Sequence, residues 1–230
     1  RHPFPGPGLA VRCLCADAGT IAAASANGAV DAEKFAAITA KALAGTDLRA
    51  DVLPLRSVGV QGDGRTYAHP AVLTCEAGAF FPGENGAATW DDLERVSTEL
   101  TNSTPAINRV LFQLGPRKRL LQRLRQGFLT QDRLDMLREA DAIIMDALVS
   151  HELMAQVTQM PTVLVPLSSD GSAESVVLRP ITTDDFMTAR FDRLPTSFLS
   201  EVTEAILQID GIEAVYYDVT HKPPGTVEWE

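Results

Sequence analysis

The chain has 230 residues, 45% of them hydrophobic, so it can bury the core of one large domain or two small ones. Its net charge of −10 argues against nonspecific nucleic-acid binding and requires any anionic ligand to be held by a local cluster of positive charge. No apolar run is long enough to cross a bilayer, and no signal peptide is present. We therefore expect a cytoplasmic protein without membrane or nucleic-acid partners.

The first half of the chain predicts short strands and helices. Residues 1–8 are rich in Pro and Gly, which excludes regular structure, and residues 9–15 are typical of a strand. Residues 16–30 indicate a loop or a weak helix, after which Asp31 is a plausible N-cap for a helix that ends near Gly45. The remaining patterns predict strands at residues 51–61, 71–75 and 107–114, and an amphipathic helix at residues 90–101.

The second half begins with a basic run, residues 117–129, whose interleaved leucines favour a helix with a solvated basic face over a phosphate or RNA site. Thr130 caps a longer helix. Strands are predicted at residues 162–167, 174–181 and 212–219, with a helix at residues 195–209. The three cysteines, Cys13, Cys15 and Cys75, have no regular spacing, which favours reduced thiols over disulfides or a metal site.

An internal repeat organises these elements. Residues 90–112 align with residues 195–217 without a gap, and both segments predict a helix, a short loop and a strand. Strand-like segments upstream of each also match. Hairpin-connected strands with helices on one side indicate the α+β class, here as two similar small β-β-α-β modules, each a short sheet with its helix on one face, joined by a helical linker.

The last nine residues, 222–230 (KPPGTVEWE), are not composed like a frayed terminus. Two prolines stiffen the segment, and a glycine allows a sharp change of direction. Lys222 offers a point charge suited to a phosphate, and Glu228 offers acceptors suited to the ring N–H groups of a base or to a guanidinium. We expect Trp229 to anchor the tail by packing rather than to stack on a base.

Two further candidates have equally plain structural explanations. In residues 62–65 (GDGR), the glycines could form an anion-binding turn, Arg65 could clamp a phosphate and Asp63 could accept from a ribose hydroxyl. Spacing alone favours an ordinary hairpin turn. The amide of Gln159 could read a purine edge, but an exposed residue at a helix end is the plainer interpretation. Residues 182–185 (TTDD) could bind Mg²⁺, although a capped turn is favoured.

Four segments together resemble GMP synthase, the glutamine-hydrolysing enzyme that aminates XMP: residues 1–9 (RHPFPGPGL), 57–65 (SVGVQGDGR), 183–188 (TDDFMT) and the tail. The resemblance implies the family's dimerisation domain in its longer, two-module form. It implies an entry segment with a strand and a helix (1–47), a first dimerisation-like module (48–116), a helical linker (117–156) and a second module with a nucleotide-binding tail (157–230). It also implies XMP contacts at Asp63, Arg65, Gln159, Lys222 and Glu228.

The sequence contains neither a pyrophosphate-binding loop nor an amidotransferase Cys/His/Glu set of the kind that the family uses. The resemblance therefore implies a piece of a ligase that binds XMP or GMP and dimerises, has no catalytic or metal-binding residue and is inactive alone. ATP and Mg²⁺ would serve the whole enzyme, whose ATP pyrophosphatase and glutamine amidotransferase domains would be its partners. The alternatives are a stand-alone purine-nucleotide-binding or dimerisation module without catalysis and, less well supported by the charge, a small nucleic-acid-binding domain.

Overall fold

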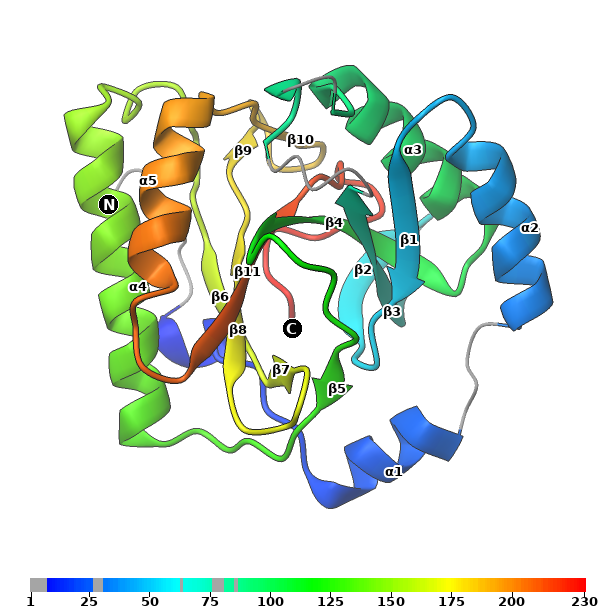
Figure 1. Ribbon diagram of the computed structural model, residues 1–230, viewed down its shortest axis with the longest axis horizontal. Coiled ribbons are helices and arrows are strands. Elements are labelled where there is room, and N and C mark those ends of the chain that lie inside the picture. The colour runs from blue at the N-terminus through cyan, green and yellow to red at the C-terminus, as the bar shows by residue number, and fades with distance from the viewer. Residues whose placement is uncertain (1–7, 27–30, 63, 76–80, 85–86) are drawn as a thin grey trace.

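The computed structural model describes residues 8–26, 31–62, 64–75, 81–84 and 87–230, which are built around one central sheet (Figure 1). Its seven strands are β1 (Leu48–Val52), β2 (Ser57–Gln61), β3 (Gly64–Cys75), β4 (Ile107–Gly115), β6 (Thr162–Val165), β8 (Glu174–Leu178) and β11 (Ile212–Asp218). Six strands follow the order β1-β3-β4-β11-β8-β6. The seventh, β2, pairs with the first part of β3 as a hairpin.

The sheet consists of two similar halves. In the first, β3 and β4 are parallel and joined by α3 (Trp90–Ser103), with β1 antiparallel to β3. In the second, β8 and β11 are parallel and joined through α5 (Thr196–Ile206), with β6 antiparallel to β8. The predicted α+β class and the two similar modules are confirmed. The halves do not form separate sheets, because β4 and β11 pair antiparallel. Each strand thereby supplies hydrogen-bond partners for the backbone N–H and C=O groups at the other's edge.

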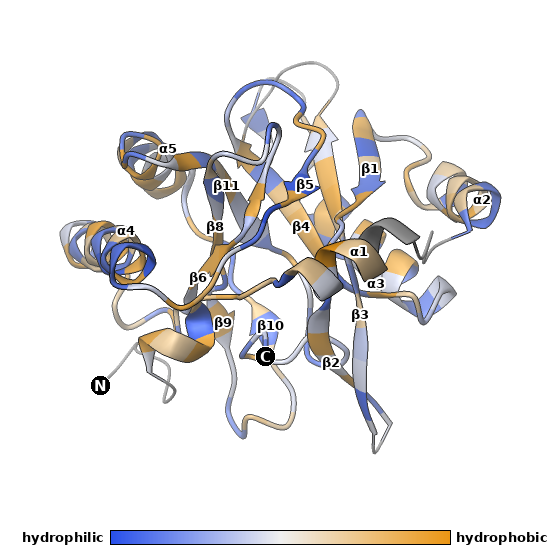
Figure 2. Ribbon diagram, turned by 90° about the horizontal axis from the view of Figure 1, so that it is seen from below, coloured by the Kyte–Doolittle hydropathy of each residue, from blue (hydrophilic) through white to orange (hydrophobic). Residues whose placement is uncertain are grey.

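One face of the sheet is covered by helices α3, α4 (Gln131–Ser150) and α5, with α2 (Ala32–Ala42) against α3. The amphipathic pattern is the cause: Leu93, Val96 and Leu100 of α3 are fully buried against the sheet. The caps act as predicted. Asp31 accepts hydrogen bonds at the start of α2, and Thr130 does so at the start of α4. Figure 2 shows apolar residues running along β4 and its neighbouring strands.

The other face has a second apolar cluster, because alternate residues of each strand point to opposite sides. Val72, Leu111 and Tyr216 lie on this face, whereas Leu73, Phe112 and Tyr217 lie on the helical face. Among the described residues, no helix contributes a side chain to the second cluster. Segments from three parts of the chain cover it instead, through Leu14, Leu120 and Trp229. Trp229 is 1% exposed, which confirms it as a packing anchor.

Two expectations are wrong. Residues 9–15 form a 3₁₀ helix, η1 (Leu9–Arg12), and then a single bridge from Cys13 to Leu164. The reason is a contact with a distant part of the chain. The buried guanidinium of Arg12 pairs with Asp141 at 2.8 Å, and this ion pair favours the helical turn over an extended strand.

Residues 117–129 are not helical, and contain only the two-residue strand β5 (Arg123–Leu124), paired with β7 (Leu167–Ser168). The Gln113 amide donates to the carbonyls of Pro116 and Lys118, which holds the segment in an open turn. The 16–30 region contains α1 (Ala18–Ala26), so the weak-helix option is correct where the chain is described.

Candidate functional site

The C-terminal tail returns across the sheet and pairs with β2. The Val60 N–H donates to the Pro224 carbonyl at 2.8 Å, and the Val58 N–H donates to the Trp229 carbonyl at 3.0 Å. Between them, Gly59 bridges to Gly225. A side chain at Gly59 would place its Cβ 2.8 Å from the Pro224 carbonyl oxygen, so this close approach requires a glycine. The tail is therefore an ordered part of the fold.

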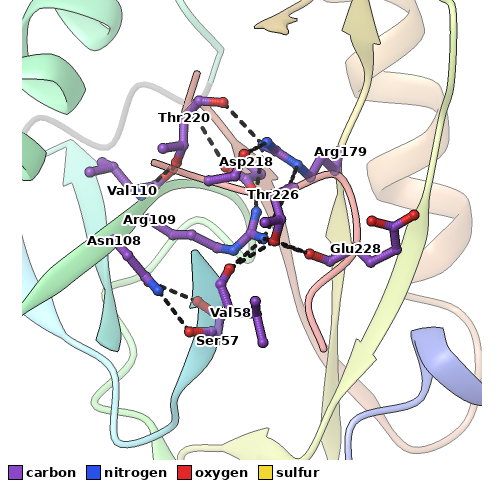
Figure 3. A network of polar contacts seen from close by, with 11 residues as sticks. Ser57, Val58, Asn108, Arg109, Val110, Arg179, Asp218, Thr220, Thr226 and Glu228 are labelled. Atoms are coloured by element: carbon purple, nitrogen blue, oxygen red, sulfur yellow. Dashed lines mark hydrogen bonds and ion pairs between the residues drawn. The ribbon is translucent and has the colours of Figure 1, made fainter. Parts of the chain in front are cut away.

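A buried charge cluster lies beneath the tail (Figure 3). Arg109 comes from β4, Arg179 directly follows β8, and Asp218 ends β11. All three side chains are 0% exposed. The Asp218 carboxylate accepts from Arg109 at 2.8 Å and pairs with Arg179 at 2.9 Å. One carboxylate therefore bridges two guanidinium groups where the two halves of the sheet meet.

Other donors of both arginines bind backbone carbonyls of the tail and of the adjoining Thr220. Arg179 donates to the carbonyls of Gly225 and Thr226, each at 2.9 Å, and to that of Thr220 at 3.1 Å. Arg109 donates to the Thr226 carbonyl at 2.9 Å and the Glu228 carbonyl at 2.8 Å. These bonds to charged donors fix the path of the tail backbone, because an alternative path would leave buried guanidinium groups without acceptors.

Two guanidiniums share one buried carboxylate in this cluster. Burial and the adjacent Arg179 charge lower the pKa of Arg109, and the carboxylates of Asp218 and Glu228 act against this lowering. Burial likewise lowers the pKa of Arg179. Both groups remain protonated at neutral pH. The Asp218 and Glu228 carboxylates together offset the charge of these two buried arginines.

Three of the predicted ligand residues come together around the tail. The Lys222 backbone pairs with Ala189, and the Gln159 backbone pairs with Ile181. Ile181 and Ala189 in turn form a small buried apolar cluster with Val227, the residue before Glu228. Gln159, Lys222 and Glu228, from distant parts of the sequence, are thus linked through one cluster. The Glu228 side chain is directed away from the buried charges while its carbonyl faces them (Figure 3).

Arg65 lies farther from these residues. It is exposed on β3 and pairs with Val60, whose other neighbour is the tail at Pro224. Two strand spacings, roughly 10 Å, therefore separate the Arg65 backbone from the tail, a span that a long arginine side chain can partly bridge. Gly62 has a φ of 62°, as the predicted turn requires. Asp63 lies outside the described residues.

Sequence reasoning missed Arg109, Arg179 and Asp218. A signal was present, since each is a charged residue within or next to an apolar strand: INRVLF, SVVLRP and VYYDV. Charged side chains are almost never fully buried unless they are paired, so a strand charge indicates a partner elsewhere. The partner was not identifiable from the sequence, because Arg109 and Asp218 are 109 positions apart.

Other candidate sites are weaker. In residues 182–185, the Asp185 carboxylate accepts from the N–H groups of Met187 and Thr188, so this segment is a capped turn as favoured from the sequence. Within the described residues, no group of three or more His, Cys, Asp or Glu side chains could hold a metal ion. The three cysteines are free. No helix among the described residues has the length and apolarity to cross a membrane.

A cavity of about 370 Å³ opens beside Trp229, lined by residues that include Leu14, Tyr67 and His69. None of the predicted ligand residues lines it. The candidate site is therefore the region around Lys222, Gln159 and Glu228, which the backbone pairing and the small apolar cluster link to one another.

Comparison with known proteins places the chain in a family. The GMP synthase C terminal domain family matches residues 46–119 and 146–229. The chain is 36% identical to a probable glutamine-hydrolysing GMP synthase of Leptospira interrogans over all of this chain and 35% of that protein. It is 28% identical to GMP synthase of Dictyostelium discoideum over all of this chain and 36% of that one.

GMP synthase of Pseudoalteromonas atlantica is 43% identical but matches only 45% of this chain. The chain spans about a third of the length of the two relatives that it matches throughout. Because the family match covers both halves of the sheet and ends within the tail, the chain belongs to the GMP synthase C-terminal domain family.

Proposed function

We propose that this chain binds XMP within a glutamine-hydrolysing GMP synthase, where ATP-dependent amination of XMP yields GMP. The observation that carries the proposal is the tail held by Arg109 and Arg179, with Lys222 and Glu228 on it and Gln159 beside it. A rigid tail lowers the entropic cost of ordering its polar groups around a ligand.

Each residue has a role that fits its chemistry. Lys222 meets the phosphate, and Arg65 clamps the same group from the β2–β3 hairpin. Glu228 accepts from the ring N–H groups of the base, and Gln159 both donates to and accepts from the purine edge. Asp63 accepts from a ribose hydroxyl. The buried arginines hold the tail without touching the nucleotide, since both are fully buried.

The rest of the reaction belongs to other domains. ATP activation of XMP and ammonia supply need the ATP pyrophosphatase and glutamine amidotransferase domains, with Mg²⁺ and ATP held there. This chain contributes substrate positioning, and by itself it does not convert XMP. We also propose that it associates as a homodimer in the whole enzyme. The alternative, a stand-alone purine-nucleotide-binding or dimerisation module, would bind nucleotide or pair with itself without supporting any amination.

Calorimetric titration of XMP into the 230-residue chain tests the proposal. Lys222→Ala removes a charged donor, so we expect a loss of about 10- to 100-fold in affinity, equivalent to roughly 1.5–3 kcal/mol. Lys34→Ala on the exposed side of α2 is the matched control and should bind like wild type. The proposal is wrong if XMP binds neither this chain nor a form that is extended at the N-terminus by the preceding domain. Amination activity of the extended form excludes the stand-alone module.

A further inference from the structure

The loop between β9 (Ile181–Thr182) and β10 (Arg190–Phe191) contains an unfavourable backbone conformation. Phe186 has a φ of 58°, in the left-handed region that glycine adopts freely and that bulky residues rarely enter. Its side chain is 46% exposed, and that of Met187 is 75% exposed. Burial of these side chains therefore does not explain why Phe186 keeps this conformation.

Local hydrogen bonds maintain the loop. The Asp185 carboxylate accepts from the Met187 N–H at 2.9 Å and the Thr188 N–H at 3.1 Å. The Thr183 hydroxyl accepts from the Phe186 N–H at 2.9 Å and donates to the Thr188 carbonyl. Strained residues that are held so firmly are typical of sites where the backbone itself has a task.

That task is visible in the contact with the tail. The Phe186 carbonyl accepts a hydrogen bond from the Lys222 ammonium, and the Lys222 charge contributes to lowering the pKa of Asp185, after the backbone hydrogen bonds from Thr188 and Met187. At its other end the loop is tied to Thr158, whose hydroxyl accepts from the Thr183 N–H at 3.2 Å. Thr158 directly precedes Gln159, so the loop connects two of the residues assigned to XMP.

We propose that Phe186 is a positioning residue for Lys222: its left-handed backbone aims its carbonyl at the ammonium group and so fixes the two remaining N–H donors for a nucleotide phosphate. A free lysine side chain would lose its rotamer freedom when it binds the phosphate, and the carbonyl contact removes that cost in advance. The inference rests on the proposed function, because it assigns a phosphate to Lys222. It attributes no direct ligand contact to the phenyl ring.

Two substitutions at Phe186 separate the carbonyl from the ring. Phe186→Gly removes the ring but favours the left-handed backbone, whereas Phe186→Val also removes the ring and disfavours that backbone, since a β-branched residue is an outlier there. We expect Phe186→Gly to bind XMP like wild type and Phe186→Val to bind about tenfold more weakly. In thermal unfolding, Phe186→Gly should match or slightly exceed wild type, because glycine relieves the unfavourable φ, and Phe186→Val should fall slightly below it.

A second readout needs no ligand. Acetylation of lysines by a water-soluble succinimidyl ester, followed by mass spectrometry, should modify Lys222 slowly in wild type and Phe186→Gly, and several-fold faster in Phe186→Val. Lys34 should react equally in all three. Equal Lys222 reactivity in the two variants, or equal loss of XMP affinity in both, would overturn the inference. If wild type does not bind XMP, the proposed function fails, while the acetylation pattern still decides whether Phe186 holds Lys222.

Discussion

The substitution Asp218→Asn tests whether the buried charge cluster holds the molecule together. Asparagine has the same shape but no charge, so Arg109 and Arg179 would face each other at 0% exposure without a neutralising partner. Removing one partner of a buried pair costs about 3–5 kcal/mol in the free energy of unfolding. Here one carboxylate serves two arginines, so we expect the upper part of that range. For a chain of this size a loss in that upper part lowers the midpoint of thermal unfolding by about 8–20 °C.

Urea denaturation followed by far-UV circular dichroism would measure the change, with Asp146→Asn on the exposed side of α4 as the matched control. The control should change the free energy of unfolding by less than about 0.5 kcal/mol. A loss below about 1 kcal/mol for Asp218→Asn would refute the reasoning, because it would mean that the arginines reach water or another anion when Asp218 is neutral.

Three further predictions concern single residues. Trp229→Ala should cost about 3–5 kcal/mol in the free energy of unfolding, because the residue is 1% exposed and its ring centre lies 4.8 Å from the Arg109 guanidinium carbon. Trp229→Phe should cost less. Equal costs of the two substitutions in urea denaturation would contradict the packing role. Burial lowers the pKa of His69 below its ordinary 6.5, so the unfolded chain takes up a proton first as the pH falls, and stability present above pH 6.5 is lost below it. His69→Phe should make the decline between pH 7 and 5.5 shallower by up to about 1.4 kcal/mol per pH unit, and an unchanged slope would exclude His69 as its source. Burial raises the pKa of Cys13 to about 11 and that of Cys75 to about 12. Iodoacetamide should therefore modify the exposed Cys15 before the other two thiols, as followed by mass spectrometry. Modification of Cys13 or Cys75 before Cys15 would show that the fold opens at that thiol.

The regular elements of the fold were largely predictable from the sequence, because local signals define them. Asp31 and Thr130 cap helices whose apolar positions repeat with the helical period. The repeat predicted two modules of the same kind. It did not predict that they share one sheet, since pairing of β4 with β11 depends on contacts between the halves. Residues 9–15 were mispredicted because a distant polar partner, Asp141 for Arg12, overrides the local pattern. In residues 117–129, side-chain hydrogen bonds from the nearby Gln113 to the backbone have the same effect.

The packing of the tail through Trp229 was predictable from its composition, but the groups that hold the rest of the tail were not. The chemistry of Lys222 and Glu228 and the anchoring role of Trp229 follow from residue types in one short segment. What holds that segment does not, because the guanidiniums that bind its carbonyls come from β4 and from the end of β8. The left-handed Phe186 was equally beyond prediction, since nothing in its local sequence requires a positive φ.

The central claim is that the tail and its neighbours form the nucleotide site. The most direct test is hydrogen–deuterium exchange with and without saturating XMP. The claim predicts slower exchange on XMP addition in residues 220–230 and 157–160, the segments that contain Lys222, Glu228 and Gln159, and in the Arg65 hairpin. Helix α1 should exchange at the same rate in both states. XMP binding that leaves exchange of the tail unchanged would contradict the claim and place the nucleotide elsewhere on the molecule.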